Sequence, residues 1–279
     1  MALTPTYARR RLGAELRRLR VRAALTGESV AETCGWSHTK VVRIETAKVS
    51  LSRHDLSRLC GLYEATEDET ARLEGWREDT RGSRWWLEYE SILSARLQEY
   101  ISLEAQASSI HAAGSSVMPG LLQSRGYAQA LFDTAPLVPD PDEADVLLEV
   151  RMRRQKLLAG DVTVSVTMAA ALLYVYTGGR EVLRGQLEHL LKIGKLPNVE
   201  LHVVPFESAS RPIEGGITLF DFASAHEPSV AVSEHQGGLV IRDGDIEVRR
   251  FRRILDHLKM HALSAEATES LIRRRLEEL

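Results

Sequence analysis

Hydrophobic residues in the first 80 positions recur with the spacing of α-helices. A first apolar stripe has its members three or four residues apart, as one face of a helix requires. It consists of Leu12, Leu16, Leu19 and Ala23. Two further helices are predicted to start at Ser52 and Thr66, because each is followed three residues later by an acidic residue, as in a capping box. We expect these helices to end near Tyr63 and Trp76.

The intervening segment, residues 25–48, predicts a helix, a tight turn and a second helix. Thr26 is suited to cap the first of these helices, because its side-chain oxygen can accept a hydrogen bond from an unpaired backbone N–H. Gly35 stands where the chain needs a left-handed backbone conformation to stop that helix, and Ser37 is suited to cap the next one. The whole region therefore predicts an all-α domain of five helices.

The second helix of this segment has two chemically different faces. Val41 and Ile44 fall on one face and are expected to pack against the rest of the domain. Thr39, Arg43 and Thr46 fall on the opposite face and are expected to be exposed. A helix, turn and helix with a polar outer face is typical of the helix-turn-helix, whose second helix enters the major groove of DNA.

Several side chains are therefore predicted to contact double-stranded DNA. In a helix-turn-helix the residues at the start of the second helix reach the base edges. The predicted contacts are Thr26, Ser37, His38, Thr39, Lys40, Arg43 and Lys48. Arg43 has the forked donors that suit a guanine, whereas Lys40 is better suited to a phosphate.

Charge is distributed unevenly along the chain. Residues 1–60 contain 12 Lys and Arg against 5 Asp and Glu, a net charge of +7. The other residues contain 24 against 34, a net charge of −10, so the overall value of −3 hides a bipolar molecule. A basic region favours polyphosphate binding, because neutralised phosphates release bound cations. The acidic remainder is not expected to lie on DNA.

The N-terminal residues resemble the Xre/Cro-type helix-turn-helix regulators, which include the lambda-repressor-like domains. The resemblance covers residues 9–76 and rests on residues 16–20, Leu25, Thr26, Ala31, Gly35, Ser37, residues 43–45 and Lys48. It implies a largely buried ion pair between Arg20 and Glu45, which fixes the angle between the first helix and the recognition helix. The chain departs from the family at Gly27, where a DNA-contacting Gln is usual. It also departs at Ala47, where Gly is usual, and this second departure predicts a slightly different helix end.

Beyond residue 84 the pattern mixes helical and strand periods. Helices are predicted over residues 89–110, 124–132, 141–158 and 179–193, and two more are predicted to be capped by Asp245 and Ser264. Short apolar runs predict strands over residues 162–168, 199–204, 217–222, 230–232 and 239–241. We therefore expect an α+β domain over residues 84–279 with a small mixed or antiparallel sheet. A polar break at residues 80–83 separates it from a helix-turn-helix domain over residues 1–80.

This second domain resembles the C-terminal domain of WhiJ-like regulators, which are antitoxin-like Xre proteins abundant in sporulating actinobacteria. The resemblance rests on residues 117–123, 127–128, 151–155, 197–199 and 204–206. Genes of this family commonly neighbour one for a short companion protein, so the resemblance implies that the acidic domain binds a small partner and thereby controls DNA occupancy. The residues assigned to the partner are Pro119, Leu121, Leu122, Tyr127, Arg151 and Arg154. Relatives usually place an acidic residue near residues 169–172, where this chain has Ala-Ala-Ala-Leu.

Some of these features have a plainer interpretation. Residues 119–122 are also typical of a turn that starts a buried helix. The arginines at 151–154 are also typical of a helix face that is solvated or paired within the domain. Trp85 and Trp86 fit either an exposed docking patch or a core anchor. Because an α+β domain can enclose a small molecule, a ligand-sensing transcriptional repressor is the alternative to a partner-binding regulator.

The remaining sequence features restrict the class of protein. No stretch has the length and apolar character of a signal peptide or a membrane span, so a cytoplasmic location is expected. Cys34 and Cys60 have the surroundings of small buried residues. The chain lacks a Gly-x-Ser-x-Gly elbow, a phosphate-binding loop and Cys/His metal spacing, so we expect no catalysis, metal or cofactor. One small domain reads few bases, so a homodimer on two half-sites is expected, joined through the second domain.

Overall fold

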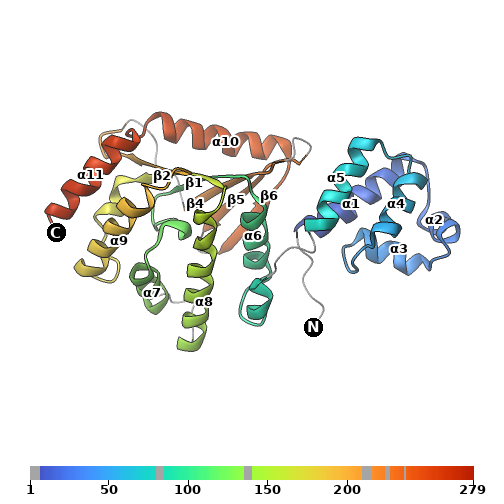
Figure 1. The fold of residues 1–279 in the computed structure, drawn as a ribbon, viewed down its shortest axis with the longest axis horizontal. Helices are drawn as coiled ribbons and strands as arrows, with labels where there is room; N and C mark the ends of the chain where they lie inside the picture. Colours follow the sequence, from blue (N-terminus) through green and yellow to red (C-terminus); the bar gives the residue numbers. More distant parts are fainter. Residues whose placement is uncertain (1–6, 80–84, 135–139, 209–214, 224–226, 236) are drawn as a thin grey trace. The chain divides into compact units, whose positions relative to one another are not determined.

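The computed structural model describes residues 7–79, 85–134, 140–208, 215–223, 227–235 and 237–279 (Figure 1). The chain forms two compact units: the first spans residues 1–87 and also includes Glu227, and the second begins at Glu88. The polar break expected at residues 80–83 lies outside the described residues. Within the described ranges, no helix has the length and apolar character needed to cross a lipid bilayer.

Over the described residues 7–79, the N-terminal unit is a bundle of five helices, as the hydrophobic pattern predicts. The helices are α1 (Tyr7–Arg22), α2 (Gly27–Cys34), α3 (His38–Glu45), α4 (Arg53–Leu62) and α5 (Glu67–Asp79). Thr66 and Glu69 exchange the two hydrogen bonds of a capping box, at 3.0 and 3.2 Å, before the first turn of α5. Ser52 caps α4 by accepting the N–H of Asp55. α5 continues past Trp76, where the sequence pattern places its end.

All five helices contribute to one hydrophobic core. Its most deeply buried members are Leu16, Leu19, Val30, Leu56 and Leu73. Cys34 and Cys60 are unoxidised thiols buried in the same core, where they pack as small apolar residues. Because the core joins the first helix to the last, shortening one of these leucines to alanine is expected to destabilise the whole bundle, by about 2–5 kcal/mol.

Four of these helices end in the same way, with one residue in the left-handed conformation. The residues are Ala24, Gly35, Ala47 and Glu64, with φ between 51° and 64°. At the end of α3 the N–H of Ala47 donates to Ile44 and the N–H of Lys48 donates to Arg43, which is the Schellman pattern. The prediction of a different helix end at Ala47 is therefore wrong. Ala47 adopts the backbone conformation that Gly usually takes there, which costs about 1–2 kcal/mol for a residue with a β-carbon.

The C-terminal unit is built on a six-stranded mixed sheet in the order β3-β2-β1-β4-β5-β6. The strands are β1 (Ser109–Gly114), β2 (Thr163–Ala169), β3 (Val199–Val204), β4 (Gly216–Asp221), β5 (Val230–His235) and β6 (Gly238–Arg242). β1, β2 and β3 run parallel, whereas β4, β5 and β6 continue the sheet as antiparallel neighbours. The prediction of an α+β domain is thus confirmed, and its sheet is mixed.

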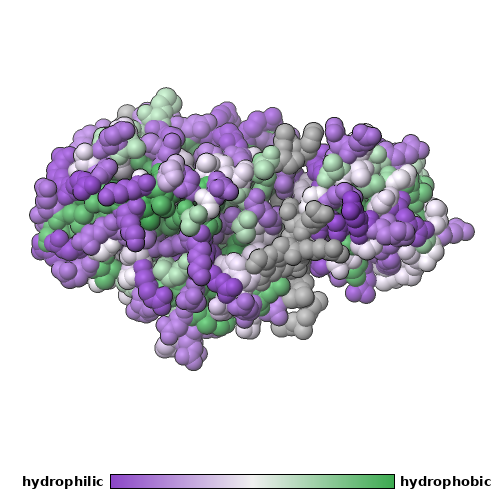
Figure 2. Space-filling model, in the orientation of Figure 1, coloured by the Kyte–Doolittle hydropathy of each residue, from purple (hydrophilic) through white to green (hydrophobic). Residues whose placement is uncertain are grey.

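Helices cover both faces of this sheet (Figure 1). α6 (Ala95–Gln106), α7 (Arg125–Thr134), α8 (Pro141–Arg154) and α9 (Arg180–Ile193) lie on one side, and α10 (Asp245–Met260) lies on the other. α11 (Ala265–Glu277) packs on β3 and α9. Successive residues of β4 serve opposite layers, because Leu219 packs with Leu255 of α10 whereas the Phe220 ring lies 5.3 Å from that of Tyr100 on α6. Hydrophilic residues cover most of the face drawn in Figure 2.

Two sequence-based boundaries are corrected by the structure. Residues 89–110 do not form one helix, because α6 ends at Gln106 and β1 follows directly. β1 lies between two strands and carries the small residues Ala112 and Ala113, so its composition gives little of the β-branched signal that marks a strand. The cap of α10 is Gly244, while Asp245 lies in the first turn, where a carboxylate favours the helix dipole.

Candidate nucleic-acid interface

Helix α3, the second helix of the helix-turn-helix segment, has one buried and one exposed face, in the arrangement that its sequence pattern predicts. Val41 and Ile44 are 3% and 4% exposed and join the core of the bundle. Thr39, Arg43 and Thr46 are exposed on the opposite side. Their side chains are therefore accessible to a molecule that approaches this face of the helix.

The other predicted contacts lie near the two ends of α3. Ser37 and His38 are exposed at its start, and Lys48 is exposed beyond its end. Ser37 also accepts the N–H of Lys40 at 3.2 Å, so its hydroxyl already caps the helix. Thr26 caps α2 and exchanges two hydrogen bonds with Ser29. The short polar residues at both helix starts thus determine where each helix begins.

An ion pair holds α1 against the end of α3. Arg20 donates from Nε and a terminal nitrogen to the two carboxylate oxygens of Glu45, at 2.6 and 2.9 Å. A third donor of Arg20 reaches the carbonyl oxygen of Leu25 at 2.9 Å. The two charged side chains are only 14% and 8% exposed, so solvent screens the pair weakly. This is the pair implied by the resemblance to the Xre/Cro-type regulators, and it constrains the orientation of α3.

A glycine on α1 permits a second contact at the same place. A β-carbon on Gly13 would lie 2.6 Å from the carbonyl oxygen of Glu45 and 2.7 Å from that of Ile44. Both neighbours are backbone atoms, so neither can turn aside as a flexible side chain would. The absence of a side chain at Gly13 therefore allows α1 and α3 to meet backbone to backbone.

Lys40 has two partners within the N-terminal unit. Its ammonium nitrogen lies 3.1 Å from a carboxylate oxygen of Asp55 on α4. The same nitrogen lies 3.8 Å from the ring centre of Trp36, which is in the turn of the helix-turn-helix. A phosphate that binds Lys40 must therefore compete with a carboxylate and an aromatic ring.

Gly27, one of the two departures from the Xre/Cro-type pattern, leaves room for the side chain of His38. A β-carbon on Gly27 would lie 2.9 Å from the Nε2 atom of His38. The same Nε2 atom lies 3.4 Å from a carboxylate oxygen of Glu28, and both side chains are more than half exposed. The imidazole thus occupies the space beside the start of α2 that a larger residue at position 27 would fill.

A charged network ties α1 to α5 on another side of the bundle. Glu15 pairs with Arg18 and Arg72, while Glu69 pairs with Arg18 and Arg22, at distances of 2.6–3.0 Å. The hydrogen bond from Arg22 lowers the pKa of the Glu69 carboxyl to about 2, and hydrogen bonds from Thr66 and Arg18 act in the same direction. Glu69 is therefore ionised in the folded protein at every pH above that range.

In the C-terminal unit, three glutamines hold the loop at residues 118–124. Gln123, Gln155 and Gln186 donate to carbonyl oxygens of this loop at distances between 2.6 and 3.0 Å. Gln186 also accepts the N–H of Ser124. Because buried backbone groups need hydrogen-bond partners, these side chains allow the loop to lie inside the unit.

The side chains assigned to a partner from this loop are mostly interior. Leu121, Leu122 and Tyr127 are 6%, 0% and 2% exposed, whereas Pro119 is half-buried. Residues 120–122 form a short 3-10 turn after which the chain enters α7. The expectation of partner contacts by these three side chains is corrected, because they pack in the core and are covered. Of the two interpretations of this motif, the structure favours the turn that starts a buried segment.

The two arginines assigned to a partner also have internal contacts. Arg154 forms two hydrogen bonds with Glu104, at 2.7 and 2.9 Å, and both residues are buried. Arg151 donates to Gln123 and lies 5.3 Å from the ring centre of Phe132. Burial, together with repulsion by Arg154, lowers the pKa of Arg151 to about 10. Both arginines therefore behave as the internally paired helix face that was the plainer interpretation. The prediction that Arg154 contacts a partner at the surface is corrected, because its side chain lies in a buried ion pair.

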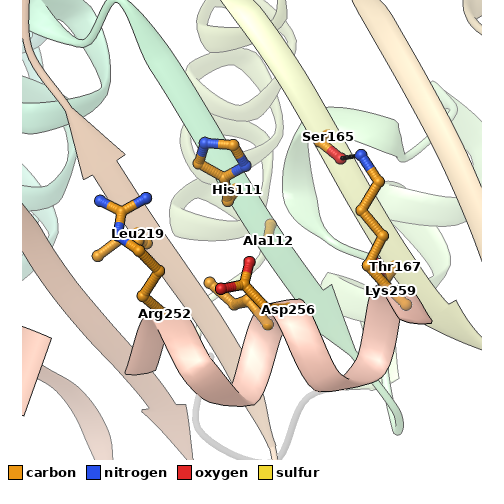
Figure 3. A pocket seen from close by; sticks show the side chains of 9 residues that line it. His111, Ala112, Ser165, Thr167, Leu219, Arg252, Asp256 and Lys259 are labelled. Carbon is orange, nitrogen blue, oxygen red and sulfur yellow. Dashed lines mark hydrogen bonds between the residues drawn. The ribbon is translucent and has the colours of Figure 1, made fainter. Parts of the chain in front are cut away.

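A cavity of about 40 Å³, lined by both polar and apolar side chains, lies between the sheet and α10 (Figure 3). Near it, Asp221 accepts hydrogen bonds from Arg252 and Ser229 and lies 3.4 Å from the Nε2 atom of His111. Burial opposes ionisation of Asp221, but hydrogen bonds from His111, Arg252 and Ser229 hold its pKa below the usual range. Ser109 approaches the same Nε2 atom at 3.0 Å. A Ser-His-Asp relay uses both ring nitrogens, so this cluster does not have that geometry.

Two groups of contacts were not anticipated from the sequence. The first group consists of the contacts of Lys40 with Asp55 and Trp36, which are not its neighbours in the sequence. The sequence does offer one signal, because an aromatic residue in the turn followed by a lysine favours a cation–π contact between the two. The loop-holding residues Gln155 and Gln186 lie on different helices. A buried loop needs hydrogen-bond partners for its backbone, so side chains of this kind can be expected. That rule does not say which residues supply them.

Comparison with known proteins gives two family matches. A model described as a helix-turn-helix domain matches residues 11–73. A model described as a domain of unknown function, DUF5753, matches residues 97–274. No curated protein and no solved structure matches the chain.

Proposed function

Because this chain belongs to the DUF5753 family and carries a helix-turn-helix domain typical of DNA-binding regulators, we propose that it is a sequence-specific transcriptional regulator of the WhiJ-like, antitoxin-like Xre type. Its N-terminal unit binds operator DNA. Its C-terminal unit binds a small companion protein that changes DNA occupancy. The observation that carries the proposal is the exposed polar face of α3 on a bundle whose α1–α3 contact is constrained by Arg20 and Gly13.

Specific roles follow for the side chains on that face. Arg43 lies one turn into α3 and reads a guanine through its two parallel donors. His38 and Thr39 reach base edges at the start of the helix. Lys40 and Lys48 bind phosphates, which position the helix without reading sequence. Thr26 and Ser37 support these contacts by fixing the helix starts.

The regulator acts as a homodimer in this proposal. A single bundle presents few side chains to the bases, whereas two bundles on related half-sites double the number read. The C-terminal unit supplies the dimer contact, since the N-terminal unit, whose residues 1–87 carry a net charge of +4, repels a second copy of itself. We place the protein in the cytoplasm, where the DNA is accessible.

The cavity beneath α10 is too small to serve as the pocket of a small-molecule effector. Pockets for small ligands usually enclose about 300–1,000 Å³. The cavity beneath α10 measures about 40 Å³, which is enough for very few water molecules and too little for a metabolite. A regulatory ligand at this position therefore has no room in the structure, whereas a polypeptide can bind the outer surface.

The test uses the purified full-length chain and the product of the neighbouring gene. A duplex selected from a random pool should bind more tightly than unselected duplex, with an affinity that falls as salt rises. Adding the companion should then change the affinity for the selected duplex. Equal affinity for both duplexes at several salt concentrations would contradict sequence-specific regulation. A retained metabolite seen by mass spectrometry, with no effect of the companion, would favour the small-molecule alternative.

A further inference from the structure

The basic residues of α10 fall into two groups that lie on different sides of the helix. The side chains of Arg252 and Lys259 point from α10 towards the sheet (Figure 3). Arg252 pairs with Asp221, and the Nζ atom of Lys259 lies 2.7 Å from a carboxylate oxygen of Glu200. Seven residues, or two helical turns, separate the two cations, so they share one face. Both are thereby neutralised within the unit.

The second group points away from the sheet. We call this side the α10 outer face, and it consists of Ile246, Arg249, Arg250, Arg253, His257 and Met260. These residues recur at the three- and four-residue spacing of one helix face. Arg249, Arg250 and Arg253 are exposed, and within the part of the chain that the structure describes none of their side chains forms a hydrogen bond or an ion pair. Three positive charges are therefore available on one surface.

This concentration of positive charge runs against the charge of its surroundings. Residues 88–279 contain 20 Lys and Arg against 27 Asp and Glu, a net charge of −7. Several arginines elsewhere in the unit have carboxylate partners, as Arg273 has Glu269 and Arg153 has Glu88. A cluster of unpaired arginines on an otherwise acidic unit is complementary to an acidic ligand.

The ends of the α10 outer face distinguish between two kinds of acidic ligand. Ile246 and Met260 are 77% and 73% exposed. Fourteen residues of helix separate them, which places them about 21 Å apart along the axis. A phosphate backbone has no pockets for exposed aliphatic side chains, whereas a protein surface can bury both. The combination of a basic centre with apolar ends therefore favours a polypeptide over DNA.

We propose that the α10 outer face is the docking surface for the companion protein, and that the companion presents an acidic patch between two apolar depressions. This inference rests on the proposed function, which supplies the companion. It assigns the contact to residues outside the motif that resembles WhiJ-like proteins, whose side chains are largely interior. The arginines steer and orient the companion, while Ile246 and Met260 supply the contacts that exclude water.

The test reverses charges on two helices of the same unit. The full-length variant Arg250→Glu/Arg253→Glu changes the α10 outer face, and Arg273→Glu/Arg274→Glu is a matched control on exposed positions of α11. Binding of the neighbouring gene product is measured by calorimetry at low and high salt. The first variant should bind at least about tenfold more weakly, and the control should stay within about twofold of the wild type. Added salt should weaken companion binding by the wild type more than companion binding by the first variant.

Further variants and measurements separate the possible failures. Ile246→Ser/Met260→Ser should weaken companion binding without altering its salt dependence, and circular dichroism should show that each variant is folded. Unchanged companion binding by the α10 variants would overturn the docking surface and leave the companion itself in place. A loss of affinity for unselected duplex by Arg250→Glu/Arg253→Glu alone would assign the surface to DNA and also overturn the proposal. If the wild type fails to bind the companion, both the proposed function and this inference fall.

Discussion

Gly13 of α1 and Glu45 of α3 approach so closely that a β-carbon on the glycine would lie 2.6 Å from the glutamate carbonyl oxygen. The carboxylate of the same glutamate is held by Arg20, two turns further along α1. Both the main chain and the side chain of Glu45 are therefore fixed by the first helix. This double contact determines how the end of the recognition helix is presented.

Replacing Gly13 by alanine should displace α3 and destabilise the N-terminal unit. The new methyl group meets two backbone oxygens, and such overpacking usually costs about 1–3 kcal/mol. The control is Gly75→Ala in α5, where a β-carbon meets no atom within 4 Å and helix propensity predicts about 1 kcal/mol of stabilisation. Urea denaturation of both variants, with gel-shift titration of each, checks the prediction. Equal stability of the two variants would show that α1 and α3 separate easily.

Arg43→Ala should weaken binding to the selected duplex by about 1–3 kcal/mol and relax the preference at one base pair. The reason is that, in the proposed function, the exposed guanidinium reads a base rather than a phosphate. The control Arg17→Ala removes the same charge from an exposed position on α1. Equal losses on selected and unselected duplex for Arg43→Ala would contradict the base-reading role.

Lys40→Ala should lower the affinity for all duplexes by a similar factor, because a phosphate contact carries no sequence information. The loss should be small, since the ammonium group already pairs with Asp55 and stacks on Trp36. Asp55→Asn removes the competing carboxylate and should raise affinity on every duplex. Gel-shift titrations of both variants on selected and random DNA measure these changes. A sequence-dependent effect of Lys40→Ala would assign the lysine to a base instead.

Acid should destabilise the N-terminal unit through Glu69. The folded pKa of this carboxyl is about 2, below its ordinary value of 4.5, so its contribution to stability is complete above that ordinary value. The contribution is lost as pH falls from about 5 towards 2. Glu69→Gln should lower stability at pH 7 by about 1.5–3 kcal/mol and flatten the pH dependence across this window. Thermal unfolding between pH 2 and 7 measures both effects, and parallel curves for wild type and variant would contradict the assignment.

Ala24→Gly should stabilise the N-terminal unit by about 1 kcal/mol. Ala24 is exposed and left-handed, with φ of 56°, so glycine removes backbone strain without opening a cavity. The same substitution at the exposed helical residue Ala14 should instead destabilise by about 1 kcal/mol. Thermal denaturation of the two variants should therefore show shifts of opposite sign, and shifts of the same sign would rule out relief of strain.

The N-terminal unit was the more predictable half of the chain, because its signals are local. Ser37 caps α3 and Gly35 ends α2 where their chemistry places them. Ala47 is instructive in the opposite sense. The end of α3 is set by the Schellman hydrogen bonds, which form although residue 47 is not glycine. The sequence predicts a different helix end at Ala47, but the backbone keeps the usual one.

Non-local contacts explain what the sequence left undetermined. β1 is a strand because β2 and β4 pair with it on both sides, not because its own residues favour strands. Leu122 and Tyr127 look like surface candidates in a motif, yet the glutamines that bury their loop come from distant helices. Which side chains pair across a fold depends on packing that periodicity does not encode.

The loop held by Gln123, Gln155 and Gln186 contributes to the interior of the C-terminal unit rather than to a surface that could bind a partner. A chain that retains this loop and its three amides should adopt the same interior, whichever molecule it recognises. Residues on the outer side of α10 contribute little to that interior and can vary independently. Likeness in the motif is therefore a guide to architecture, whereas partner choice must be sought in surface residues that the motif does not contain.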